Sequence, residues 1–412
     1  MSASEAAGQD SLADGRQAWT RLAAAVALST IGGVGMWSVV VALPAVQAEF
    51  GALRAGASLP YTLAMVGFAF GGVLMGRLAD RFGVMLPILG GTVALGLGYI
   101  GAGLSTSLWQ FALAHGLLIG FLGSSATFGP LIADTSQFFV RRRGLAVAIC
   151  ASGNYLAGTF WPPVVQYFIA TAGWRATHIG IGLFCIATML PLALLLRRRP
   201  PRLTAAQAAR GGDRTPAALG LSPLGLQGLL AVAGIACCVA MSMPQVHIVA
   251  YCGDLGYGVA NGAQMLSLML GFGIISRIGS GFVADRIGGL ATLLLGAALQ
   301  GLALLLYLAF DGLASLYVIS ALFGLFQGGI VPSYAIIVRE YFPAGEAGER
   351  VGMVLMATLF GMALGGWLSG AIFDFTGTYQ AAFANGLAWN LVTVSIISWL
   401  MLRAGRRAAV TA

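Results

Sequence analysis

The chain has 412 residues, of which 58% are hydrophobic and only 9% charged, and its formal net charge is +8. Soluble domains are about 45–50% apolar and about 25% charged, so the composition places this chain outside the soluble class. Windows of about 20 apolar residues, enough for a hydrocarbon core of about 30 Å, recur along it. Because these runs are continuous and do not alternate, they predict an all-α integral membrane protein.

Breaks in charge and turn residues predict twelve transmembrane helices. Their expected ranges are 22–44, 59–78, 86–104, 109–133, 144–170, 176–196, 224–250, 260–283, 289–309, 314–338, 351–373 and 380–402. The longest polar segment, rich in Arg, Pro and Gly, divides them into two six-helix bundles. The expected order is therefore tail, bundle, linker, bundle and tail, with the ranges 1–19, 20–196, 197–222, 223–403 and 404–412.

Arginine sets the expected orientation, since all 22 basic residues are arginine. Every arginine except Arg54, Arg175 and Arg277 falls in a terminus or in a loop after an even-numbered span. By the positive-inside rule both termini are cytoplasmic. The arginines flank apolar spans and form no patch with interleaved aromatics, so no nucleic-acid partner is expected. The five cysteines include no Cys-x-x-Cys pair, and we expect no metal site or cofactor.

An eight-residue motif, G-x-x-x-D-R-x-G, follows the second and the eighth span. It reads GRLADRFG at 76–83 and GFVADRIG at 281–288, and its two aspartates stand 205 residues apart. The first glycine is expected to permit close helix contact. The aspartate is expected to face the positive end of a neighbouring helix, for about 0.3–1 kcal/mol. Contacts made in one conformation and broken in another would bias a two-state gate; the alternative is a charge cluster that only fixes topology. The predicted gating residues are Gly76, Asp80, Arg81, Gly281, Asp285 and Arg286.

Twelve spans, a long central loop and the twin motif resemble the major facilitator superfamily over nearly the whole chain. The resemblance implies parallel six-helix repeats around a central cavity, a known plan of transporters. Four fragments narrow it further: FFVRRRGLAVAICASGNYLAG (138–158), GWR (173–175), MPQVHIVAYCGDLG (243–256) and GIISRIGSGFVADRIG (273–288). Together they are similar to the monocarboxylate porter family and to the related oxalate/formate antiporters. In those relatives the arginine of span 8 binds the substrate carboxylate, which implies that role for Arg277.

The residues around Arg277 support that role independently. An arginine at the bilayer centre costs about 2.5–3.5 kcal/mol on insertion scales and usually faces a cavity or a partner. None of the 14 acidic residues falls in the central part of a predicted span, so the sequence suggests that an anionic ligand balances the charge. Gly273, Ser280 and Gly281 are expected to leave room beside it. A structural arginine bonded to backbone carbonyls is the alternative.

The oxalate/formate antiporters add a lysine in span 11, whereas here Phe360 occupies the corresponding region and the chain has no lysine. One arginine balances one negative charge, which favours a monocarboxylate over a dicarboxylate. Asn154 and Tyr155, near the middle of span 5, are predicted to offer hydrogen bonds to a ligand. Phe128 and Tyr334 are predicted to form walls of the cavity and Phe360 to lie at the substrate-binding site, although buried aromatics more often serve packing.

Energy coupling is the least constrained step. His247 is the proton-coupling candidate, because histidine changes charge near neutral pH, but a histidine satisfied near the interface fits its position equally well. Proton-coupled monocarboxylate porters carry an acid near the start of span 1, a lysine within it, and an aspartate one turn before the span-8 arginine. Span 1 here has no charge before Glu49, and Gly273 replaces that aspartate. Anion exchange therefore stays open.

The predicted function is secondary active transport of small monocarboxylates, such as lactate or pyruvate, by alternating access. The alternatives are oxalate/formate-type exchange and the transport of a drug or sugar. We expect no enzymatic activity, because the sequence has no metalloprotease or nucleotide-binding motif. The expected partners are a small carboxylate, protons if transport is coupled to them, and the lipid bilayer of a bacterial inner membrane, around a monomeric protein.

Overall fold

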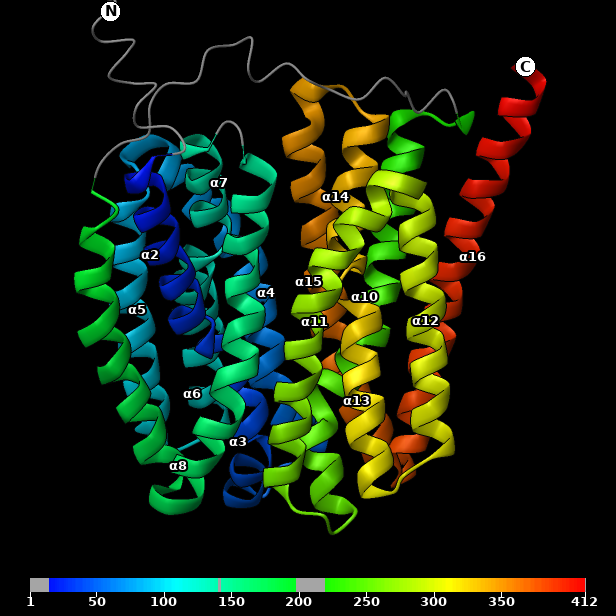
Figure 1. Cartoon of the computed structure of the whole chain (residues 1–412). Coiled ribbons are helices and arrows are strands. Elements are labelled where there is room, and N and C mark those ends of the chain that lie inside the picture. The colour runs from blue at the N-terminus through cyan, green and yellow to red at the C-terminus, as the bar shows by residue number, and fades with distance from the viewer. Residues whose placement is uncertain (1–14, 140–141, 198–218, 412) are drawn as a thin grey trace, which may run out of the picture. The chain divides into compact units, whose positions relative to one another are not determined.

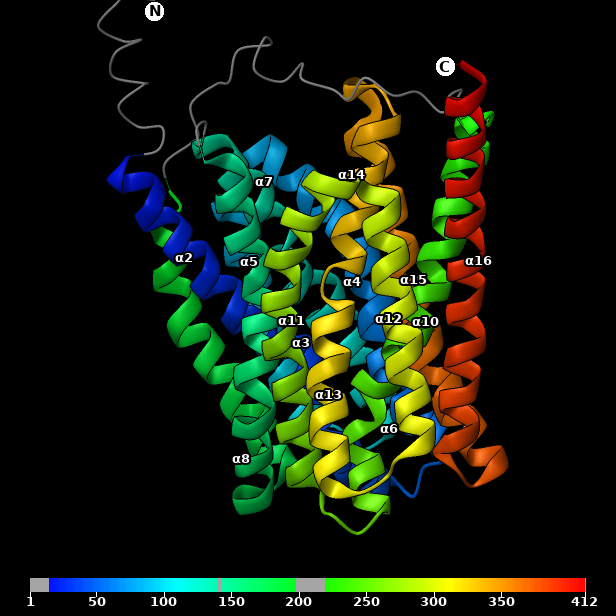
Figure 2. The same cartoon turned by 45° about the vertical axis from the view of Figure 1, so that its right-hand side comes forward.

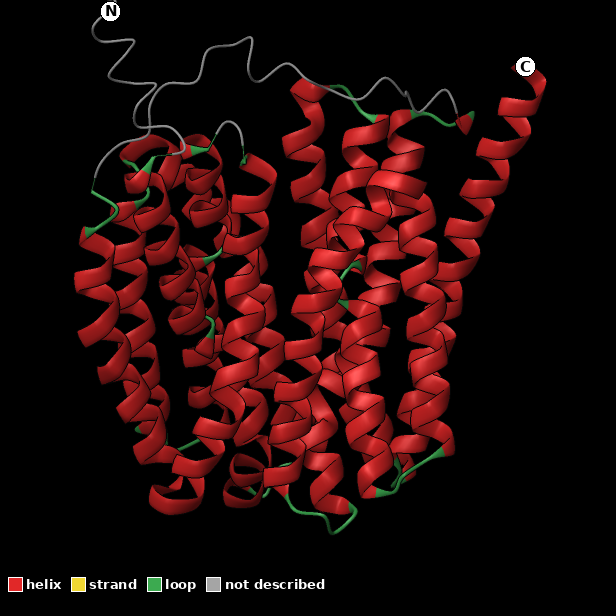
Figure 3. Cartoon of the chain, in the orientation of Figure 1, coloured by secondary structure: helices red, strands yellow, loops and turns green. Residues whose placement is uncertain are grey.

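The computed structural model describes residues 15–139, 142–197 and 219–411, and all regular structure within these ranges is helical (Figures 1 and 3). Most of the predicted N-terminal tail and linker lies outside the described residues. The helices of the first half are α2 (Arg16–Gly32), α3 (Val34–Phe50), α4 (Arg54–Phe82), α5 (Met85–Gly103), α6 (Leu108–Leu113), η1 (Ala114–Gly123), η2 (Ser124–Thr127), α7 (Gly129–Phe138) and α8 (Arg143–Leu194). Those of the second half are α10 (Pro223–Asp254), α11 (Val259–Ile287), α12 (Gly289–Ala309), α13 (Leu313–Gln327), α14 (Ile330–Tyr341), α15 (Ala344–Thr376) and α16 (Tyr379–Thr411).

Within the described residues, eleven helical segments are long and apolar enough to cross a membrane, where twelve were predicted. The difference arises at α8, a single run of 52 residues that contains predicted span 5 and all but the last two residues of predicted span 6. Its helical backbone is interrupted at Gly173, where φ is 81° and ψ is 159°, values open to glycine without strain. Figure 1 shows α8 turning back on itself at the bottom of the view. Its 52 residues are enough for two membrane passes.

The chain divides into two compact units. The first comprises Met1–Ala52 and Leu59–Thr204, and the second comprises Leu53–Ser58 and Ala205–Ala412. In the first unit α8 packs against α2, α3 and α5; in the second, α10 packs against α15 and α16, and α11 against α13. The helix α4 contributes to both units, because its first turn belongs to the second and the rest to the first.

Glycines bring the helices of each unit close together. A Cβ atom at Gly98 would lie 2.8 Å from side-chain atoms of Leu118 and Ile119, and one at Gly324 would overlap the carbonyl oxygen of Met269. Membrane helices associate through such close packing because lipid tails are as apolar as their side chains. At the C-terminal end, α16 continues to Thr411, so the stretch predicted as a tail from residue 404 is mostly helical.

Candidate functional site

Spans 4 and 10 are both interrupted near their middle. Span 4 changes from α-helix to the π-helix η1, then to the 3-10 turn η2, and resumes as α7 after Phe128. Span 10 breaks at Gly328–Gly329, between α13 and α14. Interrupted helices at corresponding positions of two repeats point to the binding region of a transporter. The two breaks therefore mark the part of each unit in which a site is expected.

In the first unit, the break in span 4 lies against the break in span 1. The helix α2 ends at Gly32, and the hydroxyl of Ser124 donates to the Gly32 carbonyl at 3.0 Å. A Cβ atom at Gly32 would lie 2.6 Å from the side chain of Thr127, so a larger residue would push the two breaks apart. Carbonyls at a helix end lack intrahelical partners, and the Ser124 hydroxyl supplies one within the apolar bundle.

Asn154 lies on α8 beside the same break. Its side-chain oxygen Oδ1 is 3.4 Å from the position that a Cβ at Gly33 would occupy. Among the described residues this buried oxygen has no hydrogen-bond partner, while the backbone carbonyl of Asn154 accepts from Trp37 Nε1 at 3.3 Å. An unsatisfied buried acceptor costs about 1–3 kcal/mol. A ligand hydroxyl could satisfy it.

The two aromatic candidates of the first unit differ in setting. Tyr155, next to Asn154, is buried, with 6% of its surface exposed. Phe128 is half-buried at the start of α7, where its backbone (φ −122°, ψ −79°) departs from helix, and its ring centroid is 6.0 Å from that of Phe68. Asn154 and Thr127, the residue before Phe128, thus both lie at the break in span 1.

In the second unit, Arg277 lies on α11, ten residues before the helix ends at Ile287. That is about 15 Å along the axis, and the side chain is half-buried. The hydroxyl of Ser280 donates to the Arg277 carbonyl at 3.1 Å. The helices α11 and α13 run beside each other (Figure 2), so Arg277 occupies the helix that packs along the interrupted span 10.

The space expected beside Arg277 is partly filled. A Cβ at Gly328 would overlap the carbonyl oxygen of Gly273, one at Gly329 would overlap Ser280, and the Gly329 amide donates to Ser276 Oγ at 3.2 Å. The break of span 10 therefore occupies part of the expected space, next to Gly273 and Ser280, whereas a Cβ at Gly281 would have no described atom within 4 Å.

Tyr334 and Phe360 complete the predicted set in the second unit. Tyr334 is fully buried, and its hydroxyl donates to the thiol sulfur of Cys237 at 3.4 Å. It therefore packs inside this unit, between α14 and α10. Phe360 is half-buried on α15.

His247 is fully buried on α10 with both ring nitrogens hydrogen-bonded. Nε2 is 2.8 Å from the Gly366 carbonyl and Nδ1 is 3.1 Å from the Tyr379 hydroxyl. A carbonyl only accepts, so the neutral ring donates from Nε2 and accepts from Tyr379 at Nδ1. The ring of Tyr379 in turn lies 5.8 Å from the guanidinium carbon of Arg54.

Arg54 is the centre of a polar cluster that the sequence did not reveal. Its Nη2 donates to both carboxylate oxygens of Asp254, at 2.9 and 2.8 Å. The carboxylate of Asp374 accepts from the backbone amides of Arg54 and Ala55, at 2.7 and 2.8 Å, and so caps the first turn of α4. One sequence signal was that Arg54 departs from the positive-inside pattern.

The twin motif ends both α4 and α11 in the same way. Its last glycine has a positive φ, 86° at Gly83 and 82° at Gly288, which explains that position in both copies. The predicted gating residues Asp80, Arg81, Asp285 and Arg286 are all exposed. A Cβ at Gly76 or Gly281 would have no described atom within 4 Å, so the close helix contact expected at these glycines is absent.

Comparison with known proteins yields relatives over most of the chain. Monocarboxylate transporter 13 of Bos taurus is 28% identical over 341 residues, covering 81% of this chain and 78% of that protein. The agnestins efflux protein of Paecilomyces divaricatus is 25% identical over 326 residues, covering 79% and 73%. The solved structure of a POT family transporter in complex with 5-aminolevulinic acid has a TM-score of 0.73 at 12% identity, covering 95% of this chain and 96% of that one, a likeness in fold alone.

The family model of the Major Facilitator Superfamily matches residues 25–314 and 280–411. These two matches together cover almost all of the described helices, from α2 to α16. The chain therefore belongs to the Major Facilitator Superfamily, and it is a multi-pass secondary transporter and not an enzyme.

Proposed function

We propose that this transporter carries small monocarboxylate anions, such as lactate or pyruvate, by alternating access, and that Arg277 binds the substrate carboxylate. The observation that carries the proposal is the position of Arg277, half-buried and ten residues inside a membrane helix beside the break of span 10. The similarity to monocarboxylate transporters over 81% of the chain supports the same substrate class.

The chemistry of arginine suits this task. Its planar guanidinium can donate two parallel hydrogen bonds to one carboxylate and stays charged at any physiological pH. Placing a charged guanidinium inside a membrane is energetically unfavourable, and ionisable residues found there are usually functional. The chain has no lysine, and Phe360 lies in span 11 where the oxalate/formate antiporters have one. Arg277 then supplies one positive charge, which balances a monoanion.

The remaining predicted residues have separate proposed roles. Asn154 would accept a hydrogen bond from a substrate hydroxyl through its open Oδ1. Tyr155, Phe128 and Phe360 would supply apolar contact, and Tyr334 would act through packing because its hydroxyl already donates to Cys237. The ends of α4 and α11, which contain Asp80 and Asp285, are the proposed gates.

His247 is the proposed proton-coupling residue. To bind a proton, Nδ1 must lose the hydrogen bond that the Tyr379 hydroxyl donates to it; the hydroxyl hydrogen can rotate away, and the Tyr379 oxygen can then accept from the charged ring. The Tyr379 ring lies 5.8 Å from the guanidinium carbon of Arg54, so a charged His247 would lie close to the polar cluster at the start of α4.

Uptake of radiolabelled lactate or pyruvate into proteoliposomes tests the proposal. Hydrogen bonds to a charged group are worth about 1.5–3 kcal/mol, so Arg277→Lys, which loses the fork, should lower uptake about tenfold or more. Arg277→Ala should abolish it. The control is Ile278→Ala, at an exposed neighbour on the same helix, which should transport normally. Equal uptake by all four proteins would exclude Arg277 as the carboxylate site.

A second candidate function is the efflux of a larger organic solute, which the similarity to the agnestins efflux protein favours. Thermal-shift screening distinguishes the two, because a ligand stabilises the native state in proportion to its occupancy. Stabilisation by small organic acids that disappears in Arg277→Ala supports the first function. Stabilisation only by larger neutral compounds, unchanged in that variant, supports the second.

A further inference from the structure

An apolar groove lies on the first unit, beside the first copy of the G-x-x-x-D-R-x-G motif at residues 76–83. Its volume is about 320 Å³, and its lining, from α4, α5 and η1, includes Met75, Leu78, Phe82, Leu86, Gly90 and Leu122. All lining side chains are apolar. A Cβ at Gly90 would have no described atom within 4 Å, so this glycine leaves part of the groove open.

The groove opens at the surface of two membrane-crossing helices. Phe82 is 45% exposed and Leu86 is 53% exposed, and both α4 and α5 qualify as spans. In a membrane, hydrocarbon is the solvent next to such residues. A concave apolar surface on a spanning helix therefore fits an acyl chain better than it fits water or a polar solute.

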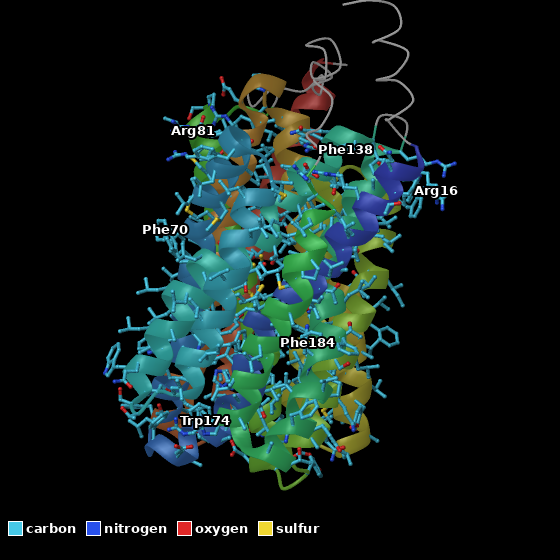
Figure 4. The ribbon with its side chains drawn as sticks, turned by 90° about the vertical axis from the view of Figure 1, so that its left-hand side faces the viewer. Arg16, Phe70, Arg81, Phe138, Trp174 and Phe184 are labelled. Carbon is cyan, nitrogen blue, oxygen red and sulfur yellow. The ribbon has the colours of Figure 1, made fainter. Side chains whose placement is uncertain are left out.

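Positive charge lies at one end of the groove. The guanidinium carbon of Arg81 is 5.2 Å from the centroid of the Phe82 ring, which lines the groove. Arg77 is one turn earlier on α4 and is also exposed. Figure 4 shows Arg81 near the end of α4 and Phe70 further along the same helix, both projecting outward. An anionic phospholipid has a negative headgroup next to its acyl chains and is therefore complementary to a basic end of an apolar groove. Basic residues at helix ends attract such headgroups.

The second copy of the motif provides a comparison within the chain. The cavity beside it has a volume of about 140 Å³ and is lined in part by Glu340. The carboxylate of Glu340 accepts from the Gly289 amide at 2.9 Å. An acidic, smaller cavity suits an anionic lipid poorly, so the two copies of one sequence motif have different surroundings.

We propose that the groove binds an acyl chain of an anionic phospholipid whose phosphate contacts Arg81. The lipid would bridge α4 and α5 at the C-terminal end of α4, where the exposed Asp80 also lies. This inference is independent of the transported substrate, because it concerns a lipid-facing surface of the first unit.

Lipid binding to the purified full-length transporter tests the proposal, by native mass spectrometry and by the thermal shift on adding phosphatidylglycerol or phosphatidylcholine. The unmodified protein should retain phosphatidylglycerol in preference to phosphatidylcholine. Gly90→Leu, which fills the groove, and Arg81→Gln, which removes the charge, should each weaken phosphatidylglycerol binding about fivefold or more. The matched controls are Gly101→Leu, at an exposed glycine of α5 with equal free space, and Arg286→Gln in the second motif, and both should bind normally.

Three results would overturn the proposal: equal retention of the two lipids, unchanged binding in Gly90→Leu, or an equal loss in Arg286→Gln. If Gly90→Leu does not fold, Arg81→Gln against Arg286→Gln decides alone, because both replace an exposed arginine in the same motif.

Discussion

Arg21 and Asp134 form a buried two-point ion pair between α2 and α7. Nε of Arg21 is 2.7 Å from Oδ2 of Asp134, and Nη2 is 2.8 Å from Oδ1. The two side chains are only 7% and 6% exposed, and the guanidinium carbon lies 4.4 Å from the Phe138 ring centroid. The predicted spans placed both residues at the membrane edge, whereas in the structure their charges are buried and paired with each other.

Removing one partner should destabilise the protein strongly. Arg21→Gln leaves the Asp134 carboxylate buried without its cation, a loss of about 3–5 kcal/mol in unfolding free energy. Replacing both residues, as Arg21→Met with Asp134→Leu, should recover most of this loss because no buried charge is then left. Denaturation in detergent measures both. A double variant no more stable than the single one would contradict this explanation.

The Arg54–Asp254 pair should contribute less. Arg54 is buried but the side chain of Asp254 is 37% exposed, so solvent weakens their attraction. A double-mutant cycle of Arg54→Gln and Asp254→Asn should give a coupling energy on the order of 1 kcal/mol. The control is Asp311→Asn, which lies in the loop after α12 and is exposed; it should show no coupling to Arg54. Strictly additive effects of the first two substitutions would show that the pair contributes nothing.

Gly328 should tolerate no larger residue. A Cβ there would overlap the Gly273 carbonyl and lie 2.8 Å from the Ser276 side chain, and overpacking costs about 1–3 kcal/mol. Gly328→Ala should therefore lower the melting temperature and reduce transport. Gly279→Ala is the matched control, because it lies on α11 with no described atom within 4 Å of its Cβ position. Equal melting temperatures for both variants would mean that span 10 can shift without cost.

His247→Gln tests the proposed proton coupling. Glutamine can replace the hydrogen bonds to Gly366 and Tyr379 but does not titrate, so the fold should persist. If His247 carries the coupled proton, uptake driven by an inward pH gradient should fall to the rate without a gradient, while exchange of labelled for unlabelled substrate continues. Tyr379→Phe controls for the loss of the hydrogen bond alone. Full gradient-driven uptake in His247→Gln would assign coupling elsewhere.

Helix positions were predicted well where composition changes sharply. The range predicted for span 9, 289–309, coincides with α12 (Gly289–Ala309), because Gly288 directly precedes it and Asp311 follows soon after it. The interruptions of spans 4 and 10 were not predicted. Hydropathy is continuous through Ser124–Thr127 and Gly328–Gly329, and a change of helix type depends on what packs against the helix.

The polar partners were harder to foresee. Arg21 and Asp134 are 113 residues apart, and Arg54 and Asp254 are 200 residues apart. Each looked like a separate edge charge, since pairing depends on which helices are neighbours. Opposite charges at the same expected membrane edge were a further hint. The position of Arg277 within its helix, by contrast, follows directly from the apolar run around it.

The polar cluster at Arg54 also has an electrical consequence. Asp254, Asp311 and Asp374 follow or end the helices α10, α12 and α15, and with Arg54 they give this end of the second unit a net charge of −2. An anion approaching it meets a repulsive field that dissolved ions screen over about 8–10 Å. Capture of the proposed anionic substrate from this side should accordingly quicken as ionic strength rises, opposite to the behaviour of a positively charged funnel.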